Sequence, residues 1–344
     1  MLLRAAEAAP AQASPPETVA AAPSLRIVTY NLCNYRDRSQ PQIRTPEARE
    51  AVLRELAELA PDIAVLVETS GEGAVADIRD ELARRGQPYP FQTTVPGADV
   101  ERRIGILARQ TPAALEHVTD STYRLRDRDV PVQRGFGHCL FAWPSGYRLH
   151  LVAAHLKSKA FDPLGQTDMR RYEARLLRYL VDDIIGREAD ANILLVGDLN
   201  DTPDSSPIST LCSRRSNPPK QLYDLRPLDR FGMSWTHYWG AADTYSRIDY
   251  AMASFGLLPE VDFALTEIPF PPDWAVASDH RPLLITLRLG ERPPSPDCLA
   301  RFERNARLPE SPAGDVHDQG AASPRSPVPG QAAAAPGQAT PARP

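Results

Sequence analysis

Acidic, amide and imidazole side chains recur in this sequence at points where short apolar runs end. The clearest case is the apolar run 193–196, which is followed at once by Gly197, Asp198 and Asn200. Ligands of α/β proteins bind beyond the carboxyl ends of sheet strands, so an acid and an amide at this place are candidates for chemistry. A strand that ends in a simple turn is the structural alternative, because Asp and Asn also form local hydrogen bonds in turns. This stretch alone does not separate the two interpretations.

Other apolar runs end or begin in the same way, and the polar residues beside them are of one chemical kind. A lone acid at a strand end is usually a solvated edge residue, but a whole set of such groups is harder to explain in that way. Carboxylates and carboxamides are hard oxygen ligands, which suit Mg²⁺, Mn²⁺ or Ca²⁺ better than zinc. Histidines beside them carry positive charge or transfer protons near neutral pH. The candidate residues are Asn31, Glu68, His155, Asp198, Asn200, Asp249, Asp279 and His280.

Hydrophobic periodicity predicts the elements that would bring these residues together. Thr45, Pro46 and Glu47 form a helix start, with an N-cap, a proline at the first helical position and an acid in the first turn. Helices are expected at 46–60, within 71–86 and at 169–185. Strands are expected at 25–30, 63–67, 104–108, 114–118, 139–143, 147–154, 193–196, 248–253 and 283–289. This order is compatible with a two-sheet α/β structure.

The composition limits the kinds of partner. The chain has 344 residues, 42% of them hydrophobic, and a formal net charge of −5. No global positive field is therefore available to capture nucleic acid, so a polyanion would need a local basic patch, a metal ion or both. No apolar run is long enough to predict a membrane-spanning helix. No CxxC pair occurs, which argues against a zinc knuckle and leaves open the disulfide state of Cys33, Cys139, Cys212 and Cys298.

Composition divides the chain into three segments. Residues 1–24 are rich in alanine and proline and are expected to be flexible. Residues 25–290 are expected to form one folded domain, and the Pro/Ala-rich residues 291–344 to be disordered. The N-terminus lacks the apolar core of a secretory signal, which indicates a cytoplasmic protein as the sequence is written. A secreted or periplasmic location stays open, because residues 5–13 are similar to the small-residue tail of a truncated signal. We expect a monomer.

Taken in order, six short motifs resemble the successive motifs of the endonuclease/exonuclease/phosphatase superfamily, which has the DNase I-like fold. The resemblance covers roughly residues 25–289, and its details are most similar to bacterial, nuclease-type members. It implies a four-layer α/β sandwich, in which two mixed β-sheets pack face to face with helices outside. One departure is Val67, where the family often carries glutamine. The motifs are Thr29–Asn31, Val67–Thr69, His155–Ser158, Gly197–Asn200, Arg247–Asp249 and Ser278–His280.

The resemblance implies a role for each acid and amide. Glu68 would be the principal ligand of a divalent metal, Mg²⁺ in the first place and Mn²⁺ or Ca²⁺ as alternatives, with Asn31 and Asp279 close to it. Asp198 would orient or deprotonate the attacking water. Asn200 would hold that water or a phosphate oxygen.

The resemblance also implies roles for the basic residues. His280 would bind the scissile phosphate or protonate the leaving group, and Asp249 would fix its tautomer through the other ring nitrogen. His155 matches the second histidine of DNase I-like members. Lys157 and Arg247 are candidates for substrate binding, although an exposed loop lysine is the structural alternative for Lys157.

Five further residues carry weaker hypotheses. Glu101 could orient His155, but an acid in a solvated turn is the ordinary alternative. Trp235 and Trp239 could stack on a nucleic-acid base, although tryptophans at such a place more often fill a core. Arg170 and Arg171 could extend the binding surface, although helix arginines usually lie on a solvent-exposed face.

The leading functional hypothesis is a metal-dependent phosphodiesterase that hydrolyses nucleic acid, with DNA endonuclease activity as its first form. A second hypothesis keeps the chemistry but changes the substrate to a phospholipid or an inositol phosphate. The acidic net charge favours it, whereas the sequence shows no apolar hairpin for membrane docking. A third, a catalytically silent binding protein, is disfavoured because every main position carries the expected side chain. Sequence leaves open DNA against RNA, and endonucleolytic against exonucleolytic attack.

Overall fold

The computed structural model describes residues 24–212, 220–293, 299–300 and 302. The segment 1–24, expected to be flexible, lies outside the described residues except for Ser24, and so does most of the segment 291–344, expected to be disordered. Leu299 and Phe302 pack against the core, so core contacts continue beyond residue 290. Among the described cysteines, Cys33 and Cys139 carry free thiols, whereas Cys298 lies outside the described residues.

Two large mixed sheets form the centre of this part of the chain. Within the first sheet β1 and β2 are parallel, and within the second β9 and β10 are parallel. The other neighbouring strands of the two sheets pair antiparallel. The first sheet has the order β15 (Leu283–Arg288), β1 (Ser24–Tyr35), β2 (Ile63–Thr69), β4 (Arg103–Ala108) and β3 (Phe91–Val95). The second has the order β11 (Leu222–Asp224), β14 (Asp249–Ser254), β10 (Ile193–Asp198), β9 (Arg148–His155), β8 (Phe136–Ala142) and β5 (Ala114–Leu115).

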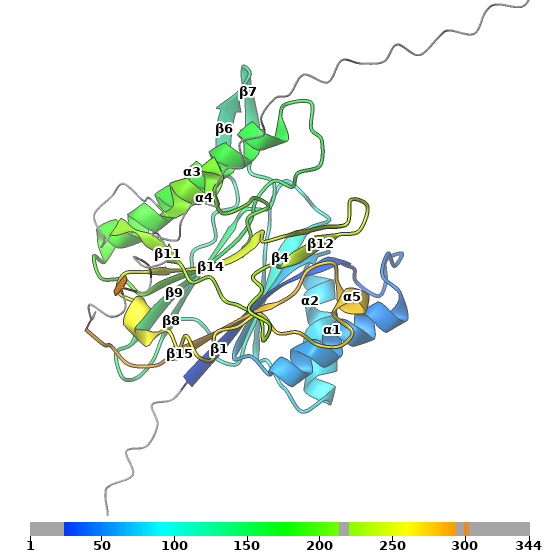
Figure 1. Cartoon of the computed structure of the whole chain (residues 1–344), viewed down its shortest axis with the longest axis horizontal. Coiled ribbons are helices and arrows are strands. Elements are labelled where there is room, and N and C mark those ends of the chain that lie inside the picture. The colour runs from blue at the N-terminus through cyan, green and yellow to red at the C-terminus, as the bar shows by residue number, and fades with distance from the viewer. Residues whose placement is uncertain (1–23, 213–219, 294–298, 301, 303–344) are drawn as a thin grey trace, which may run out of the picture. The chain divides into compact units, whose positions relative to one another are not determined.

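Helices cover the outer face of each sheet (Figure 1). α1 (Pro46–Leu59) and α2 (Glu72–Arg84) lie on the first sheet, and α3 (Gln166–Arg187) and α4 (Ser206–Cys212) on the second. Two small hairpins, β6 (Thr122–Leu125) with β7 (Arg128–Pro131) and β12 (His237–Trp239) with β13 (Thr244–Ser246), stand apart from the large sheets. A short helix, α5 (Trp274–Ala277), and a 3-10 turn, Leu258–Glu260, complete the described elements.

Three apolar clusters hold these layers together. One contains side chains of both sheets, for example Ile106 and Leu151, and fills the space between them. The second joins α3 and α4 to the second sheet, and the third joins α1 and α2 to the first. Burial of apolar surface on both faces of each sheet is what stabilises such a layered arrangement. The predicted four-layer sandwich is confirmed.

Local sequence signals account well for the helices. Thr45 caps α1 by accepting a hydrogen bond from the Ala48 backbone N–H at 3.2 Å, and Pro46 occupies its first turn as predicted. The expected helices within 71–86 and at 169–185 correspond to α2 and to a slightly longer α3. By contrast, β3 was not predicted, because the prolines that flank it indicated only turns. None of the described helices has the length and apolar character needed to cross a membrane.

Candidate active site

The end of β10 brings three polar side chains together. Asp198, its last residue, is paired with His155 at the end of the parallel strand β9 and with Asp249 at the start of the antiparallel strand β14. Leu194 and Val196 of β10 point into the core between the sheets. Because strand side chains alternate between faces, Asp198 lies on that same inner face at the rim. The sequence pattern therefore predicted this meeting point correctly.

Gly197 makes the close approach of these strands possible. Its φ is +137°, and a Cβ added to it would lie 1.9 Å from the carbonyl oxygen of Ala154. Any larger residue would push β10 away from β9. The glycine thus keeps Asp198 beside His155.

Asn31 of the first sheet connects that sheet to the site. Its Nδ2 donates to Asp198 Oδ2 at 3.0 Å, and its Oδ1 accepts the Cys33 backbone N–H at 3.0 Å. Asn31 is buried, so both bonds exclude water. This amide fixes the orientation of the Asp198 carboxylate from across the sheet interface.

Glu68 enters the site from a distorted strand. The pairing of β2 with β4 shifts register between Val67 and Thr69, and Glu68 itself has φ +62°. Residues other than glycine adopt this conformation at a cost, and they cluster at functional sites. Its Oε1 lies 3.8 Å from His155 Nε2, and burial raises the pKa of its carboxyl.

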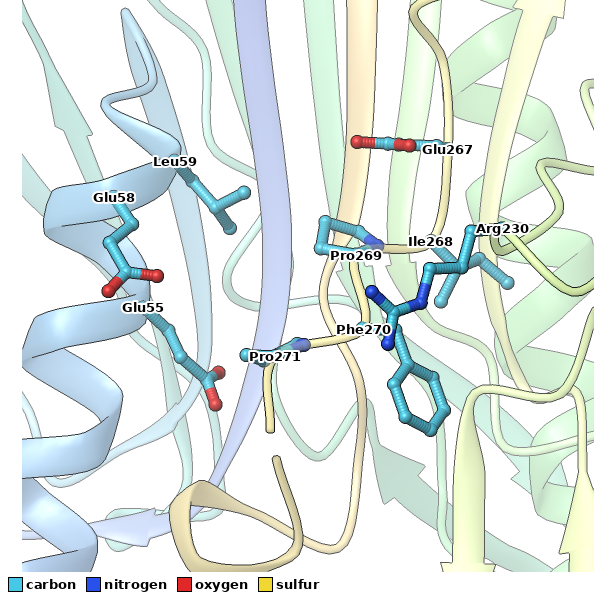
Figure 2. Close-up of a pocket in the computed structure, with 9 residues that line it drawn as sticks. All are labelled: Glu55, Glu58, Leu59, Arg230, Glu267, Ile268, Pro269, Phe270 and Pro271. Carbon is cyan, nitrogen blue, oxygen red and sulfur yellow. The ribbon is translucent and has the colours of Figure 1, made fainter. Parts of the chain in front are cut away.

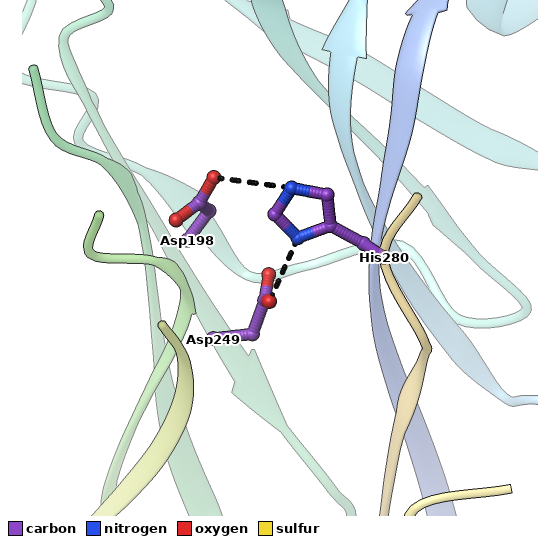
Figure 3. A group of neighbouring side chains, drawn as sticks. All are labelled: Asp198, Asp249 and His280. Carbon is purple, nitrogen blue, oxygen red and sulfur yellow. Dashed lines mark hydrogen bonds and ion pairs between the residues drawn. The ribbon is translucent and has the colours of Figure 1, made fainter. Parts of the chain in front are cut away.

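His280 lies between two buried carboxylates, as Figure 3 shows. Its Nδ1–H donates to Asp249 Oδ2 at 2.8 Å, and its Nε2 lies 4.0 Å from Asp198 Oδ2. Burial opposes the charged ring, but the negative charge and hydrogen bond of Asp249 outweigh it and raise the pKa of His280 to about 10. The ring is therefore an imidazolium at neutral pH, and Nε2 carries the proton that faces the site.

Asp198 is the carboxyl best suited to accept a proton. Burial, followed by the nearby charge of Asp249, raises its pKa to about 7. Oδ1 accepts the backbone N–H of Asn200 at 2.8 Å, which leaves the carboxylate held at both oxygens. A base is most effective when its pKa is close to the working pH.

Two further residues, Asn200 and His155, lie beside Asp198. Asn200 has φ +54° and its Nδ2 donates to the Leu156 carbonyl at 3.0 Å, so its position is fixed by the loop after β9. His155 is fully buried, and neither ring nitrogen has a hydrogen-bond partner within the described part of the chain. Burial and the positive charges of Arg134 and His280 lower the pKa of His155, so the ring is neutral and can donate to a substrate oxygen.

The donor set around Glu68 fits a hard divalent cation. The Glu68 side chain is 17% exposed, and its nearest imidazole, that of His155, is neutral. Asp279 contributes a second acid, 46% exposed, near it. Donor atoms of Asp198, Asp249 and His280 also lie within 4.8 Å of one another and could hold an ion. In that cluster the imidazolium already supplies the positive charge, so we favour Glu68 with Asn31 and Asp279 as the metal side of the site.

The two predicted substrate-binding residues differ in their surroundings. Lys157 lies at the start of the loop after β9, with its Nζ 3.9 Å from Asp162, and remains compatible with a phosphate contact. Arg247 is buried, and both of its terminal nitrogens bind Asp224, at 2.9 and 2.7 Å. A guanidinium held in this way stabilises the fold, so the substrate contact of Arg247 stays a prediction.

Most of the weaker hypotheses find ordinary explanations. Glu101 pairs with Arg36 rather than with His155, and Arg170 is buried against Asp201 rather than lying on a wet face. Trp235 packs under the guanidinium of Arg281, 3.4 Å from its ring centroid. Trp239 is 57% exposed and stays available for stacking.

Two residues near the site were missed by sequence reasoning. Arg134 is 5% exposed, and although its Nη2 binds Asp99 at 3.1 Å, its Nε and Nη1 are buried without a partner among the described residues. His237 of β12 has its ring 4.6 Å from that of His280 and its Nε2 4.0 Å from Asp279. Neither carries a local signal, because Arg134 precedes an unremarkable strand and His237 lies in an aromatic run.

Three comparisons relate the chain to known proteins. The model of the Endonuclease/Exonuclease/phosphatase family matches residues 28–280. No curated protein matches the chain. A solved endonuclease/exonuclease/phosphatase from Bacteroides vulgatus is 20% identical, with a TM-score of 0.53 over 78% of this chain and 100% of that chain.

Two further solved structures have the same fold. The human Nocturnin catalytic domain with bound sulfate anion is 17% identical, with a TM-score of 0.54 over 76% of this chain and 93% of that chain. Sphingomyelinase C from Streptomyces griseocarneus is 18% identical, with a TM-score of 0.54 over 77% of this chain and 99% of that chain. At such low identity these likenesses concern the fold and not the substrate.

Proposed function

The chain belongs to the endonuclease/exonuclease/phosphatase family, whose members hydrolyse phosphoester bonds, and from this premise we propose that it is a divalent-metal-dependent phosphodiesterase that cleaves nucleic acid, DNA in the first place. The observation that carries the proposal is the imidazolium of His280. Asp249 holds it at 2.8 Å on one side, and its other nitrogen faces Asp198 at 4.0 Å. His280, protonated and able to act as an acid, thus lies beside Asp198, whose carboxylate can act as a base.

The residues divide the work of phosphodiester hydrolysis. Asp198 accepts a proton from a water molecule, while Asn31 and Asn200 hold the carboxylate and the loop beside it. The water oxygen forms a bond to phosphorus as the bond from phosphorus to the leaving oxygen breaks. His280 Nε2–H stabilises the charge that develops on the phosphate oxygens and supplies a proton to the leaving oxygen. A divalent cation held by Glu68, when bound, adds positive charge at the same oxygens.

Arg134 supports a substrate with more than one phosphate. Its guanidinium lies close enough to lower the pKa of His155 and to stabilise the charged form of Glu68, and two of its nitrogens have no partner within the described ranges. A buried, incompletely bonded guanidinium is a strong site for a phosphate oxygen. Nucleic acid offers a second phosphate beside the one that is cleaved, whereas a simple phospholipid diester does not.

One observation favours the second candidate, a phospholipid or inositol-phosphate substrate. The hairpin β12–β13 exposes Trp239 and 52% of Tyr245, which corrects the sequence-based view that no apolar hairpin is present. Its backbone joins the catalytic segment, since Tyr238 N–H donates to the Asp279 carbonyl at 2.9 Å. Exposed aromatic rings bind a membrane interface or a nucleic-acid base.

A substrate panel tests the proposed function. We expect Mg²⁺-dependent cleavage of an oligonucleotide, no comparable hydrolysis of sphingomyelin or a phosphoinositide, and complete inhibition by a chelator. Glu68→Gln should weaken Mg²⁺ binding at least about tenfold by calorimetry, because one charged oxygen ligand is lost.

Glu72→Gln, at an exposed acid at the start of α2, is the matched control and should leave Mg²⁺ binding unchanged. Preferred hydrolysis of a phospholipid would replace the first candidate by the second. Cleavage that persists without metal would contradict both.

Arg134→Ala tests the second phosphate contact. We expect KM for an oligonucleotide to rise about tenfold or more, since a charged hydrogen-bonding pair contributes roughly 1.5 to 3 kcal/mol. The rate on bis-p-nitrophenyl phosphate, which has one phosphate, should change much less. The measurement is the ratio of kcat/KM for the two substrates in each variant.

Arg84→Ala, at an exposed arginine of α2, should keep the wild-type ratio. Melting temperatures identify any loss of folding, and Arg134→Lys retains a charge should the alanine variant be unstable. An equal loss on both substrates would mean that Arg134 acts on the scissile phosphate or on the fold.

A further inference from the structure

The hairpin β12–β13 leads from the candidate active site toward the surface (Figure 1). At its inner end the ring of His237 lies 4.6 Å from that of His280, and the Tyr238 backbone N–H donates to the Asp279 carbonyl at 2.9 Å. Residues 239–245 at its outer end are all exposed. The contacts at the inner end therefore fix the hairpin beside the histidine that we assign to the reaction.

Trp239 lies on the face of β12 that carries His237. Alternate residues of a strand project from the same face, so the two side chains are about 7 Å apart along the strand. Trp239 is 57% exposed and makes no ring contact among the described residues. By contrast, the exposed ring of Tyr245 packs on Tyr238 and Trp235, at centroid distances of 4.6 and 4.8 Å. Trp239 thus offers an indole face close to the site.

A cation lies near His237, in the loop after β9. Lys159 is exposed, forms no ion pair within the described ranges, and lies close enough for its charge to act on the His237 ring. An ammonium group at this place suits a phosphate of the substrate. The hairpin and this loop therefore supply an aromatic ring and a cation, the two kinds of group that bind a single nucleic-acid strand.

Stacking on Trp239 requires a base whose face is uncovered. In a duplex each base face is covered by the neighbouring base pair, whereas a single strand can turn its bases onto an aromatic ring. Duplex binding also depends strongly on many phosphate contacts, and the formal net charge of this chain is −5. Stacking adds affinity without further positive charge. A single strand therefore fits the hairpin better than a duplex.

The cavity between α1 and the loop 267–271 does not compete for the base (Figure 2). Its volume is about 230 Å³, and the acids Glu55, Glu58 and Glu267 line it against one cation, Arg230. This excess of negative charge disfavours a nucleic-acid strand.

The outer turn of the hairpin is unsuited to a membrane surface. Residues 240–243 are Gly-Ala-Ala-Asp, so the turn carries an acid and no large apolar side chain. An acid at this place is repelled by anionic lipids and loses hydration at the interface. The indole behind such a turn is therefore better placed for a base than for a lipid surface.

We propose that the site takes single-stranded nucleic acid, and that Trp239 stacks on a base next to the scissile phosphate. Trp239 thereby selects an unpaired strand over a duplex. Single-strand selection rests on the proposed nucleic-acid phosphodiesterase function and specifies the form of its substrate.

Cleavage of one oligonucleotide without self-complementarity, free and annealed to its complement, tests single-strand selection. We expect kcat/KM with saturating Mg²⁺ to be at least about tenfold higher for the free strand. Trp239→Ala should lower kcat/KM for the free strand at least about tenfold more than for the duplex, because only the free strand offers a base to the ring. Trp239→Phe keeps an aromatic ring and should retain most of the preference.

Tyr179→Ala, at an exposed aromatic residue of α3, is the matched control and should keep the wild-type values on both forms. Equal or faster cleavage of the duplex, or an equal loss on both forms in Trp239→Ala, overturns single-strand selection and leaves the proposed function intact. Absence of cleavage of both forms contradicts the proposed function, and single-strand selection with it. Binding to phosphatidylserine vesicles that Trp239→Ala abolishes would assign the ring to a lipid surface instead.

Discussion

Asp198→Asn is expected to reduce the rate of phosphodiester cleavage by roughly 10³-fold or more, while the protein stays at least as stable as the wild type at pH 8. The loss of rate follows because asparagine cannot accept the proton of the attacking water. The retained stability follows from burial and the charge of Asp249, which raise the pKa of Asp198 to about 7 and thus disfavour its ionised form. One acceptor for Asn31 or Asn200 is lost, at a cost of about 1 to 3 kcal/mol. At pH 8 the removal of the buried charge of Asp198 offsets this cost.

The sign of the pH dependence gives this prediction a second readout. A carboxyl whose pKa is raised in the folded state contributes stability that is present below its unfolded value of 3.8 and is lost as the pH rises through about 7. Asp198→Asn has no such group. The melting temperature of the variant relative to the wild type should therefore increase between pH 5 and pH 8.

Single-turnover rates with saturating Mg²⁺ and calorimetric melting temperatures are the measurements. Asp183→Asn, at an exposed acid of α3, is the matched control and should change neither quantity. Activity of Asp198→Asn within tenfold of the wild type would remove Asp198 from the catalytic step. A large drop in its melting temperature at pH 8 would show that the carboxylate stabilises the fold instead.

Asp249→Asn is expected to move the alkaline limit of activity to lower pH. The charge and hydrogen bond of Asp249 outweigh burial and raise the pKa of His280 to about 10, so the wild-type ring stays protonated up to that pH. Without Asp249 the pKa of His280 falls toward the ordinary histidine value of 6.5. Because His280 acts in its protonated form, the variant should lose far more rate at pH 9 than at pH 6. His280→Ala should lose about 10² to 10⁴-fold at every pH.

A pH profile of kcat from pH 6 to pH 10 tests this, with the same metal concentration in every variant. Asp243→Asn, at an exposed acid in the β12–β13 hairpin, should keep the wild-type limit. An unchanged alkaline limit in Asp249→Asn would mean that Asp249 does not set the charge of His280. Equal losses in Asp249→Asn at all pH values would point to a role in position alone.

Local pattern was enough to predict most strands of the two large sheets, though not β3 and β11, and the polar residues at their ends. Apolar runs mark buried strands, and strand side chains alternate with a period of two. Asn31, His155, Asp198 and Asp249 continue the inward-facing series of their strands by one step, so their meeting between the sheets follows from that pattern together with the family resemblance. The helix start at Thr45 is an equally local feature.

Residues whose partners are distant in sequence could not be assigned in this way. The sequence predicts a substrate contact for Arg247, whereas its bidentate bond to Asp224 depends on a strand 23 residues away. The position of Arg134 near His155, with two nitrogens that lack a partner among the described residues, depends likewise on the fold.

The sequence by itself determined most strands of the two large sheets, the side chains that lie at their ends and the chemistry that those side chains can perform. The tertiary structure alone decided the left-handed backbone conformation of Glu68, the charge of His280 and the partners of Arg134 and Arg247. The physical reason is that periodicity and capping act within a few residues, whereas burial and ion pairing depend on segments joined only by folding.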